Sequence, residues 1–427
     1  MEEVNKYESG VGFFWLAAFY FVNCARPGDL VHAFSFIPLA KLTAIAAVFM
    51  LFFSAGSTSR NFRDLPKESM YLLFLILLLF LSAALSPIWK GGAFFSTLEF
   101  SKVSVAWLLT FFLVTNLARL RRIMFIQAVS VAVVSAAALI KGHNVPRLHG
   151  VIGGFYANAN DFAFAIVLSI PFCLAFLVSA RGVLRKAAWC VCILSMTAAL
   201  ILTASRAGFI DLVISGGVCL WHLGIKGRRA YLIFGLVVAA VALLAVAGGR
   251  LKDRFSAISD GDTTSGAGTS YQARSALISR SFDAITDYPI LGVGAYNFVV
   301  YSGTWQEVHA SYLQIAAEGG ILALILYLSF FYQGFKNLRQ VFAQTQDPEL
   351  RVLAAALHSS LIGFVVGACF APEAYQFFPY FTVCYTSVLA AMPSGKRASE
   401  SVVVRFTSSG HRIVHTQGAP VPSKQAI

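Results

Sequence analysis

Residues 309–333 read HASYLQIAAEGGILALILYLSFFYQ and begin immediately after the longest polar loop of the chain, near 248–309. A helix over this stretch is long enough to cross the roughly 30 Å of hydrocarbon in a bilayer. His309 stands at the point where the apolar run begins. The stretch therefore predicts a membrane-spanning helix that starts beside a polar loop at the membrane surface.

The rest of the chain repeats this pattern. Apolar residues make up 58% of the 427 positions and charged residues only 12%, which is not the balance of a water-soluble domain. Apolar runs of spanning length predict about twelve helices. The expected ranges are 11–25, 34–53, 70–87, 101–116, 123–140, 158–179, 187–204, 207–222, 230–247, 310–333, 352–371 and 376–392. We therefore expect an all-α polytopic membrane protein, with a transmembrane bundle over 1–392 and a disordered cytoplasmic tail over 393–427.

Lysine and arginine are divided unequally between alternate loops, and cytoplasmic loops carry the excess of these residues. The basic loops are 60–67, 119–122, 181–186, 226–229 and 336–351. Both termini are accordingly expected in the cytoplasm, with the loop 248–309 on the outer side. These loops and the tail account for most of the net charge of +13, so the charge does not indicate a nucleic-acid partner.

Two candidate functional residues stand where outer loops meet the membrane. A histidine has an ordinary pKa of about 6.5, so His309 can take a proton near neutral pH beside a substrate held in the membrane. Arg206 lies alone in the short turn 203–208 between two spans, where it could bind an anion inside the bundle. The alternatives are a capping or surface role for His309 and an arginine that reaches the lipid headgroups for Arg206.

The outer loop contains a further candidate. Residues 271–288 have helical periodicity and predict an amphipathic helix along the membrane surface. Its apolar stripe consists of Tyr271, Ile278, Phe282 and Ile285. Arg274 falls in the middle of this stripe and Arg280 falls off it. A buried cation is costly unless an anion meets it, so Arg274 indicates an anion site, with a pairing to a carboxylate or a lipid phosphate as the alternative.

The remaining outer residues have simpler interpretations. The glycines of 289–297 predict a tight turn back to the membrane, because no strand precedes them as a nucleotide-binding loop requires. Asn158, Asn160 and Asp161 are expected to cap the sixth span, with hydrogen bonding to a ligand as the alternative. The outer acidic residues are scattered along the chain, so neither a metal site nor a cofactor is expected. Asp29 is kept as an alternative catalytic carboxylate.

Three motifs, in this order, resemble those of the O-antigen ligase and polymerase superfamily. They are the turn Ser205-Arg206-Ala-Gly208, the helix with Arg274 that leads into Asp287-Tyr-Pro-Ile-Leu-Gly-Val-Gly294, and His309 followed by Leu313 and Glu318-Gly319. The resemblance covers the second half of the chain, from the sixth span to the tenth. In one departure, this chain has Ala310 where the family commonly has Asn, so a contact made by that amide is missing here.

The resemblance implies a metal-independent, inverting membrane glycosyltransferase of the GT-C-like class, located in the bacterial inner membrane. Its donor would be a glycan on undecaprenyl diphosphate at the periplasmic face, and its acceptor a lipid A-core sugar or another lipid-linked glycan. His309 would be catalytic, and Arg206 and Arg274 would bind the diphosphate with bidentate hydrogen bonds. Asn160, Arg280 and Glu318 are secondary candidates.

Two alternatives remain open at this point. A repeat-unit polymerase of the same superfamily would use the same donor site as a ligase. Of the two, we favour the ligase. A solute transporter would use ionisable groups within spans, such as Asp211, Glu318 and His358. The transporter reading predicts that Arg206, Arg274 and His309 lie apart, whereas the transferase reading predicts that they meet.

Overall fold

The computed structural model describes residues 2–30, 34, 36–53, 60–142, 148, 156, 158–227, 229–232, 234, 266–392, 403–406 and 412–415. The helices are α1 (Glu2–Ala25), α2 (Pro27–Leu30), α3 (Leu39–Phe53), η2 (Phe62–Asp64), α4 (Lys67–Leu85), α5 (Lys90–Leu113), α6 (Leu117–Lys141), α7 (Ala159–Ser179), α8 (Val183–Leu202), α9 (Arg206–Leu220), η3 (Trp221–Ile225), α11 (Gly266–Asp287), α12 (Phe298–Tyr301), α13 (Ser311–Gln344), α14 (Pro348–Gly367) and α15 (Phe377–Ala390).

The membrane-spanning pattern follows the sequence. Eight of the described helices are long and apolar enough to cross a membrane, and three shorter apolar helices accompany them at 10–25, 39–53 and 377–390. Together they match every predicted range except 230–247, most of which lies outside the described residues. The all-α polytopic membrane fold is confirmed, and the chain is a multi-pass membrane protein.

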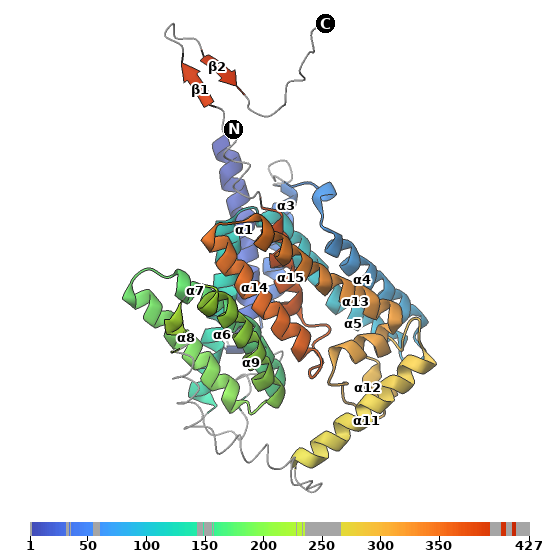
Figure 1. Cartoon of the computed structure of the whole chain (residues 1–427). Coiled ribbons are helices and arrows are strands. Elements are labelled where there is room, and N and C mark those ends of the chain that lie inside the picture. The colour runs from blue at the N-terminus through green and yellow to red at the C-terminus, as the bar shows by residue number, and fades with distance from the viewer. Residues whose placement is uncertain are drawn as a thin grey trace, which may run out of the picture.

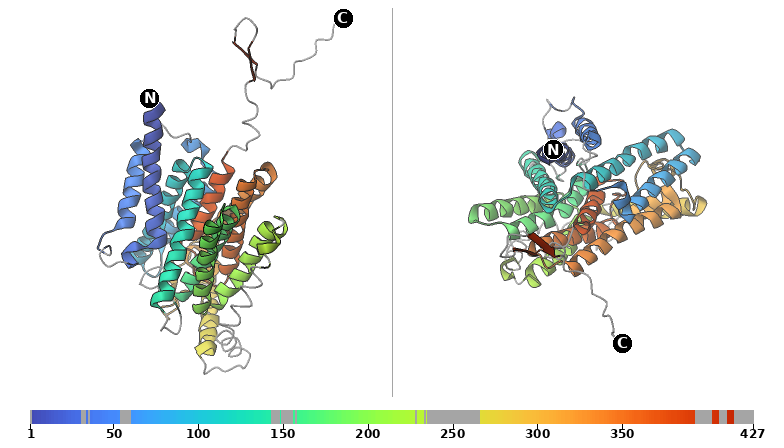
Figure 2. Two further views of the ribbon diagram at one scale, coloured as in Figure 1. Left: turned by 90° about the vertical axis from the view of Figure 1, so that its left-hand side faces the viewer. Right: turned by 90° about the horizontal axis from the view of Figure 1, so that it is seen from above.

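Helix α13 is central to the bundle. It packs against α4, α14 and α15, and also against α11. Large aromatic side chains fill the space between these helices, and Tyr20, Tyr327, Tyr380 and Tyr385 are all fully buried. Burial of rings of this size contributes much of the packing energy of such a core. The N-terminus of α1 lies at one end of the bundle and α11 lies at the other (Figure 1), and the turned view agrees (Figure 2).

The basic loops gather at one end of the molecule. Arg121, Arg181, Arg185 and Arg229, which come from three separate loops, line one cavity of about 1200 Å³. Arg121 also forms an ion pair of 2.7 Å with Glu349, at the start of α14. This end is opposite the one at which α13 begins, because α14 starts at the basic end and its last residues lie beside Ser311.

Most of the tail lies outside the described residues. Within it, β1 (Val403–Phe406) pairs antiparallel with β2 (Arg412–His415), with Val403 opposite His415. The prediction of a disordered tail over 393–427 stays untested, as does the division of the chain into a bundle and a tail.

Candidate functional site

The loop that follows α11 is bonded to an interrupted membrane helix. Gly320 has φ 80° and ψ 178°, which breaks α13 after its first ten residues. The N–H groups of Val293 and Gly294 donate to the carbonyls of Ala317 and Glu318 at 2.9 and 2.8 Å, and the N–H of Ile321 donates to the Pro289 carbonyl at 2.8 Å. Backbone groups left unpaired by the break are therefore satisfied by the loop.

Two glycines make this close approach possible. A Cβ at Gly292, which has φ 66°, would lie 2.4 Å from the Glu318 carbonyl carbon, and one at Gly320 would lie 2.2 Å from the Ile290 oxygen. Glycine accepts positive φ at little cost and adds no side chain at the contact. The prediction of a tight turn in 289–297 is confirmed.

A small apolar core fastens α11 and the segment before α13 to each other. It consists of Leu277, Ala284, Val293, Phe298, Val308 and Ala317. Val308 immediately precedes the candidate histidine, and Leu277 lies one turn after Arg274 on the same face of α11. The core therefore determines where both candidate residues lie.

The face of α11 that packs on the protein is offset from the predicted apolar stripe of Tyr271, Ile278, Phe282 and Ile285. Leu277 and Ala284 face the protein, whereas Ile278 and Phe282 have exposed fractions of 42% and 56%. Small residues such as Ala284 allow close packing against α13, and the larger side chains remain on the outer surface. Arg274 is half-buried on the protein side, and Arg280 is exposed.

The structure places Arg274 near enough to His309 for its charge to act on the imidazole. His309 is half-buried in the segment before α13. Burial lowers the pKa of His309, and the positive charge of Arg274 lowers it further, to about 4. Both effects disfavour the charged imidazolium. The imidazole is therefore neutral at pH 7 and can accept a proton, and an anion bound at Arg274 would make it a stronger base.

The other predicted residues are placed less completely. Arg206 is the first residue of α9, after the N-cap Ser205, but its side chain lies outside the described residues, as does that of Asp29. The oxygen of Asn158 accepts from the N–H of Asn160 at 2.9 Å, so Asn158 caps α7 as predicted. The charge of one principal candidate, Arg274, thus acts on a second, His309, and the side chain of the third is not placed.

Four carboxyl groups lie near enough to influence one another, and we refer to them as the acidic cluster: Asp161, Glu307, Glu318 and Glu373. Asp161 and Glu373 are direct neighbours; the charge of Asp161 acts on Glu307, and the charge of Glu307 acts on Glu318 and Glu373. Glu318 and Glu373 have exposed fractions of 1% and 0%. The view that the outer carboxylates are scattered was wrong for Asp161 and Glu307, because the fold brings α7 and the loop before α13 together. Among the described residues, no group of three or more His, Cys, Asp or Glu is placed to hold a metal ion.

Glu373 is the member of the acidic cluster that the sequence reasoning missed. Its N–H donates to the Ser311 hydroxyl at 2.9 Å, and that hydroxyl donates to the Ala371 carbonyl at 2.7 Å. The short loop after α14 is thereby tied to the first turn of α13. A signal was present, since a carboxylate in a loop this short cannot leave the bundle. A short loop holds Glu373 in the bundle just as the short turn 203–208 was expected to hold Arg206.

The acidic cluster holds protons at neutral pH. Burial, followed by the charge of Asp161, raises the pKa of Glu307 to about 7. Burial and the charges of Asp161 and Glu307 raise the pKa of Glu373 well above its usual range. Close, buried carboxyl groups cannot all be ionised. Glu307 and Glu373 are therefore groups that can hold or release a proton near neutral pH.

Two tyrosine rings pack beside the acidic cluster. The rings of Tyr296 and Tyr375 lie 5.0 Å apart, and Tyr375 also meets Phe100 edge-on at 5.2 Å. The Tyr375 hydroxyl lies near Glu318. Neither tyrosine was singled out from the sequence, where they are two aromatics among many.

These residues define a membrane protein with a neutral histidine that lies within the electrostatic influence of an arginine, at one end of the bundle. Residues 190–328 match the family model described as O-antigen ligase. The match runs from α8 into α13 and includes Arg206, Arg274 and His309, and it confirms the resemblance to the O-antigen ligase and polymerase superfamily. No curated protein matches the chain. The match indicates a glycosyltransferase-type enzyme that acts on lipid-linked glycans.

Proposed function

We propose that this protein transfers a glycan from undecaprenyl diphosphate to an acceptor sugar, as an O-antigen ligase does. The observation that carries the proposal is the neutral His309 held beside Arg274 at one membrane surface. A proton acceptor and a phosphate-binding cation near each other are the two groups that such a transfer requires.

In the proposed step, His309 acts as the general base. The acceptor hydroxyl oxygen attacks the anomeric carbon of the donor, and the hydroxyl proton passes to the free ring nitrogen of His309. The bond between the anomeric carbon and the diphosphate oxygen breaks, and its electron pair leaves with undecaprenyl diphosphate. Attack from the side opposite the leaving group inverts the anomeric centre.

Arg274 stabilises the charge that grows on the diphosphate. A guanidinium can form two parallel hydrogen bonds to phosphate oxygens and is always charged. We assign the same role to Arg206, which begins α9 at the same end of the bundle. Two arginines that act mainly in the transition state can support departure of the diphosphate without a metal ion.

We place the site on the periplasmic side of the bacterial inner membrane, with both termini in the cytoplasm. The arginines that line a common cavity at the opposite end of the bundle support this orientation, because basic loops remain in the cytoplasm. Lipid-linked glycans on the outer side of that membrane would then reach His309 directly.

The test uses the native host. Deletion of the gene followed by complementation with wild type or His309→Ala should restore long surface glycan only with wild type. Polymer left on its lipid carrier would support the ligase, whereas single repeats on the acceptor would support a repeat-unit polymerase of the same superfamily. An unchanged glycan pattern in the deletion strain, with no second gene of this kind, would refute the proposal and favour transport.

The proximity of Arg274 to His309, close enough for its charge to act on the imidazole, favours the transferase over the transporter. His358 pairs instead with His222, with the ring nitrogens 3.2 Å apart, inside the bundle. The ionisable residues that the transporter reading would use are thus divided between separate places, and the acidic cluster lies under the outer surface.

A further inference from the structure

A second cavity opens at the same end of the bundle as His309. It has a volume of about 530 Å³ and lies between α1, α2, α3, α5 and α15. Ligand pockets have typical volumes of about 300–1000 Å³. His309 and Arg274, the residues of the proposed transfer step whose side chains are described, do not line this cavity.

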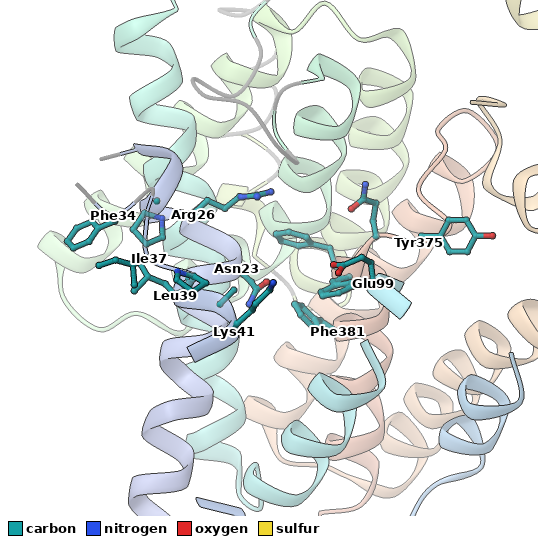
Figure 3. Close-up of a pocket in the computed structure, with 17 residues that line it drawn as sticks. Asn23, Arg26, Phe34, Ile37, Leu39, Lys41, Glu99, Tyr375 and Phe381 are labelled. Atoms are coloured by element: carbon teal, nitrogen blue, oxygen red, sulfur yellow. The ribbon is translucent and has the colours of Figure 1, made fainter. Parts of the chain in front are cut away.

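The two sides of this cavity have different chemistry. Arg26, Lys41 and Asn23 come from the side of α1 and α3, and Glu99, Phe381 and Tyr375 come from the other side (Figure 3). Phe34, Ile37 and Phe377 add apolar surface. A cavity with cations beside aromatic and aliphatic walls fits a lipid whose headgroup is anionic.

The charge of the cavity favours an anion. Glu99 forms an ion pair with Lys102, one helical turn away, so its carboxylate is already neutralised. Among the described residues, no carboxylate forms an ion pair with Lys41, and this side chain is exposed. Lys41 therefore gives the cavity a positive charge that no described carboxylate pairs with, and a phosphate is the anionic group found at this level of a membrane.

Tyr375 connects the cavity to the site of transfer. It lines the cavity, while its ring contacts Tyr296 and its hydroxyl lies near Glu318 of the acidic cluster. Figure 3 shows this hydroxyl directed away from Arg26 and Lys41. Arg274, on α11, and the cavity, beside α1 and α3, thus lie on different sides of the acidic cluster.

We propose that this cavity holds the phosphate-bearing headgroup of the acceptor glycolipid, with Lys41 and Arg26 on the phosphate and the apolar wall along the lipid chain. The inference rests on the proposed function and assigns the second substrate. Inversion requires the acceptor hydroxyl to approach from the side opposite the diphosphate. Two phosphate-bearing lipids bound on different sides of the acidic cluster satisfy that requirement.

The test measures binding of fluorescent, bisphosphorylated lipid A to the full chain in phosphatidylcholine nanodiscs. Lys41→Gln removes one charged contact to phosphate and should raise Kd about tenfold. Lys90→Gln is the matched control, because Lys90 is an exposed lysine at the start of α5, at the same end of the bundle, and does not line the cavity. This control should leave Kd unchanged, and dephosphorylated lipid A should bind wild type and Lys41→Gln equally weakly.

Competition identifies the source of the phosphate. Displacement of the probe by unlabelled lipid A, but not by an equal amount of phosphatidylglycerol or of undecaprenyl diphosphate, would support an acceptor site. Equal displacement by phosphatidylglycerol, or an equal loss of binding in Lys90→Gln, would overturn the inference. Since binding needs no transfer, His309→Ala should bind the probe as wild type does. Transfer by the His309→Ala protein would instead refute the proposed function alone.

A kinetic measurement provides an independent readout. In a transfer reaction, Lys41→Gln should raise KM for the acceptor by about the same tenfold and leave KM for the undecaprenyl-linked donor unchanged. A rise in donor KM alone would assign the cavity to the donor and overturn the inference.

Discussion

Removal of the charge of Arg274 should raise the pKa of His309. The positive guanidinium disfavours imidazolium, so Arg274→Gln removes one of the two causes that lower this pKa. The pKa of His309 is about 4, against an ordinary value of about 6.5. The difference is about 2.5 units, and burial is the larger cause. The share of Arg274 is therefore below half, and the variant should have a pKa near 5, about one unit higher.

Diethylpyrocarbonate reports this change without reference to activity, because it reacts with the neutral form of a histidine and not with imidazolium. Its rate at His309 is followed by mass spectrometry of the peptide and corrected for hydrolysis of the reagent. Wild type should retain about nine-tenths of its pH 7 rate at pH 5, and Arg274→Gln about half. Arg280→Gln, an exposed position on the same helix, should behave as wild type. A half-maximal rate near pH 6.5 in wild type, or no upward shift in Arg274→Gln, would refute the reasoning.

Three further predictions concern the same region. His309→Ala should fold and insert normally but lose transfer by about 10²–10⁴-fold, measured as product formed by purified protein and compared with its thermal unfolding; a residual rate within a few-fold of wild type would contradict the assigned role. Gly320→Ala should lower the free energy of unfolding by about 2–3 kcal/mol through its positive φ and the contact with Ile290, whereas Gly216→Ala, which meets open space, should change it by less than about 1 kcal/mol. Glu373 has a raised pKa in the folded state, so stability should fall as pH rises above the ordinary carboxyl pKa of about 4.3. Glu373→Gln should flatten this decline, measured as Tm between pH 5 and pH 8. An equal slope in both proteins would show that Glu373 is not held neutral.

The membrane fold could be read from the sequence because its physical signal is local. A helix in lipid must satisfy its own backbone and cover its surface with apolar side chains, so each span is visible as an apolar run. The predicted range 158–179 and the observed helix Ala159–Ser179 differ by one residue at the start. The position of His309 at the head of α13 followed from the same pattern.

Contacts between distant segments could not be read in this way. Glu373 is separated from Asp161 by more than half the length of the bundle sequence, and only the packing of α7 against α14 brings the two carboxyls together. The break at Gly320 was also hidden, because a glycine pair in an apolar run does not show which of the two glycines takes positive φ. The direction of Arg274 was accessible because helical periodicity relates it to neighbours a few residues away.

The pairing of the loop 288–297 with the broken helix α13 restricts how substrates can come and go. An outward movement of this loop would break its hydrogen bonds to α13. The carbonyls of Ala317 and Glu318 and the N–H of Ile321 would then be unsatisfied inside a protein surrounded by lipid. Each such group costs several kcal/mol in that environment. The loop therefore cannot serve as a lid. Substrates and products have to pass beside this fixed loop. Product release therefore depends on lateral diffusion of the lipid carrier in the membrane rather than on the opening of a gate.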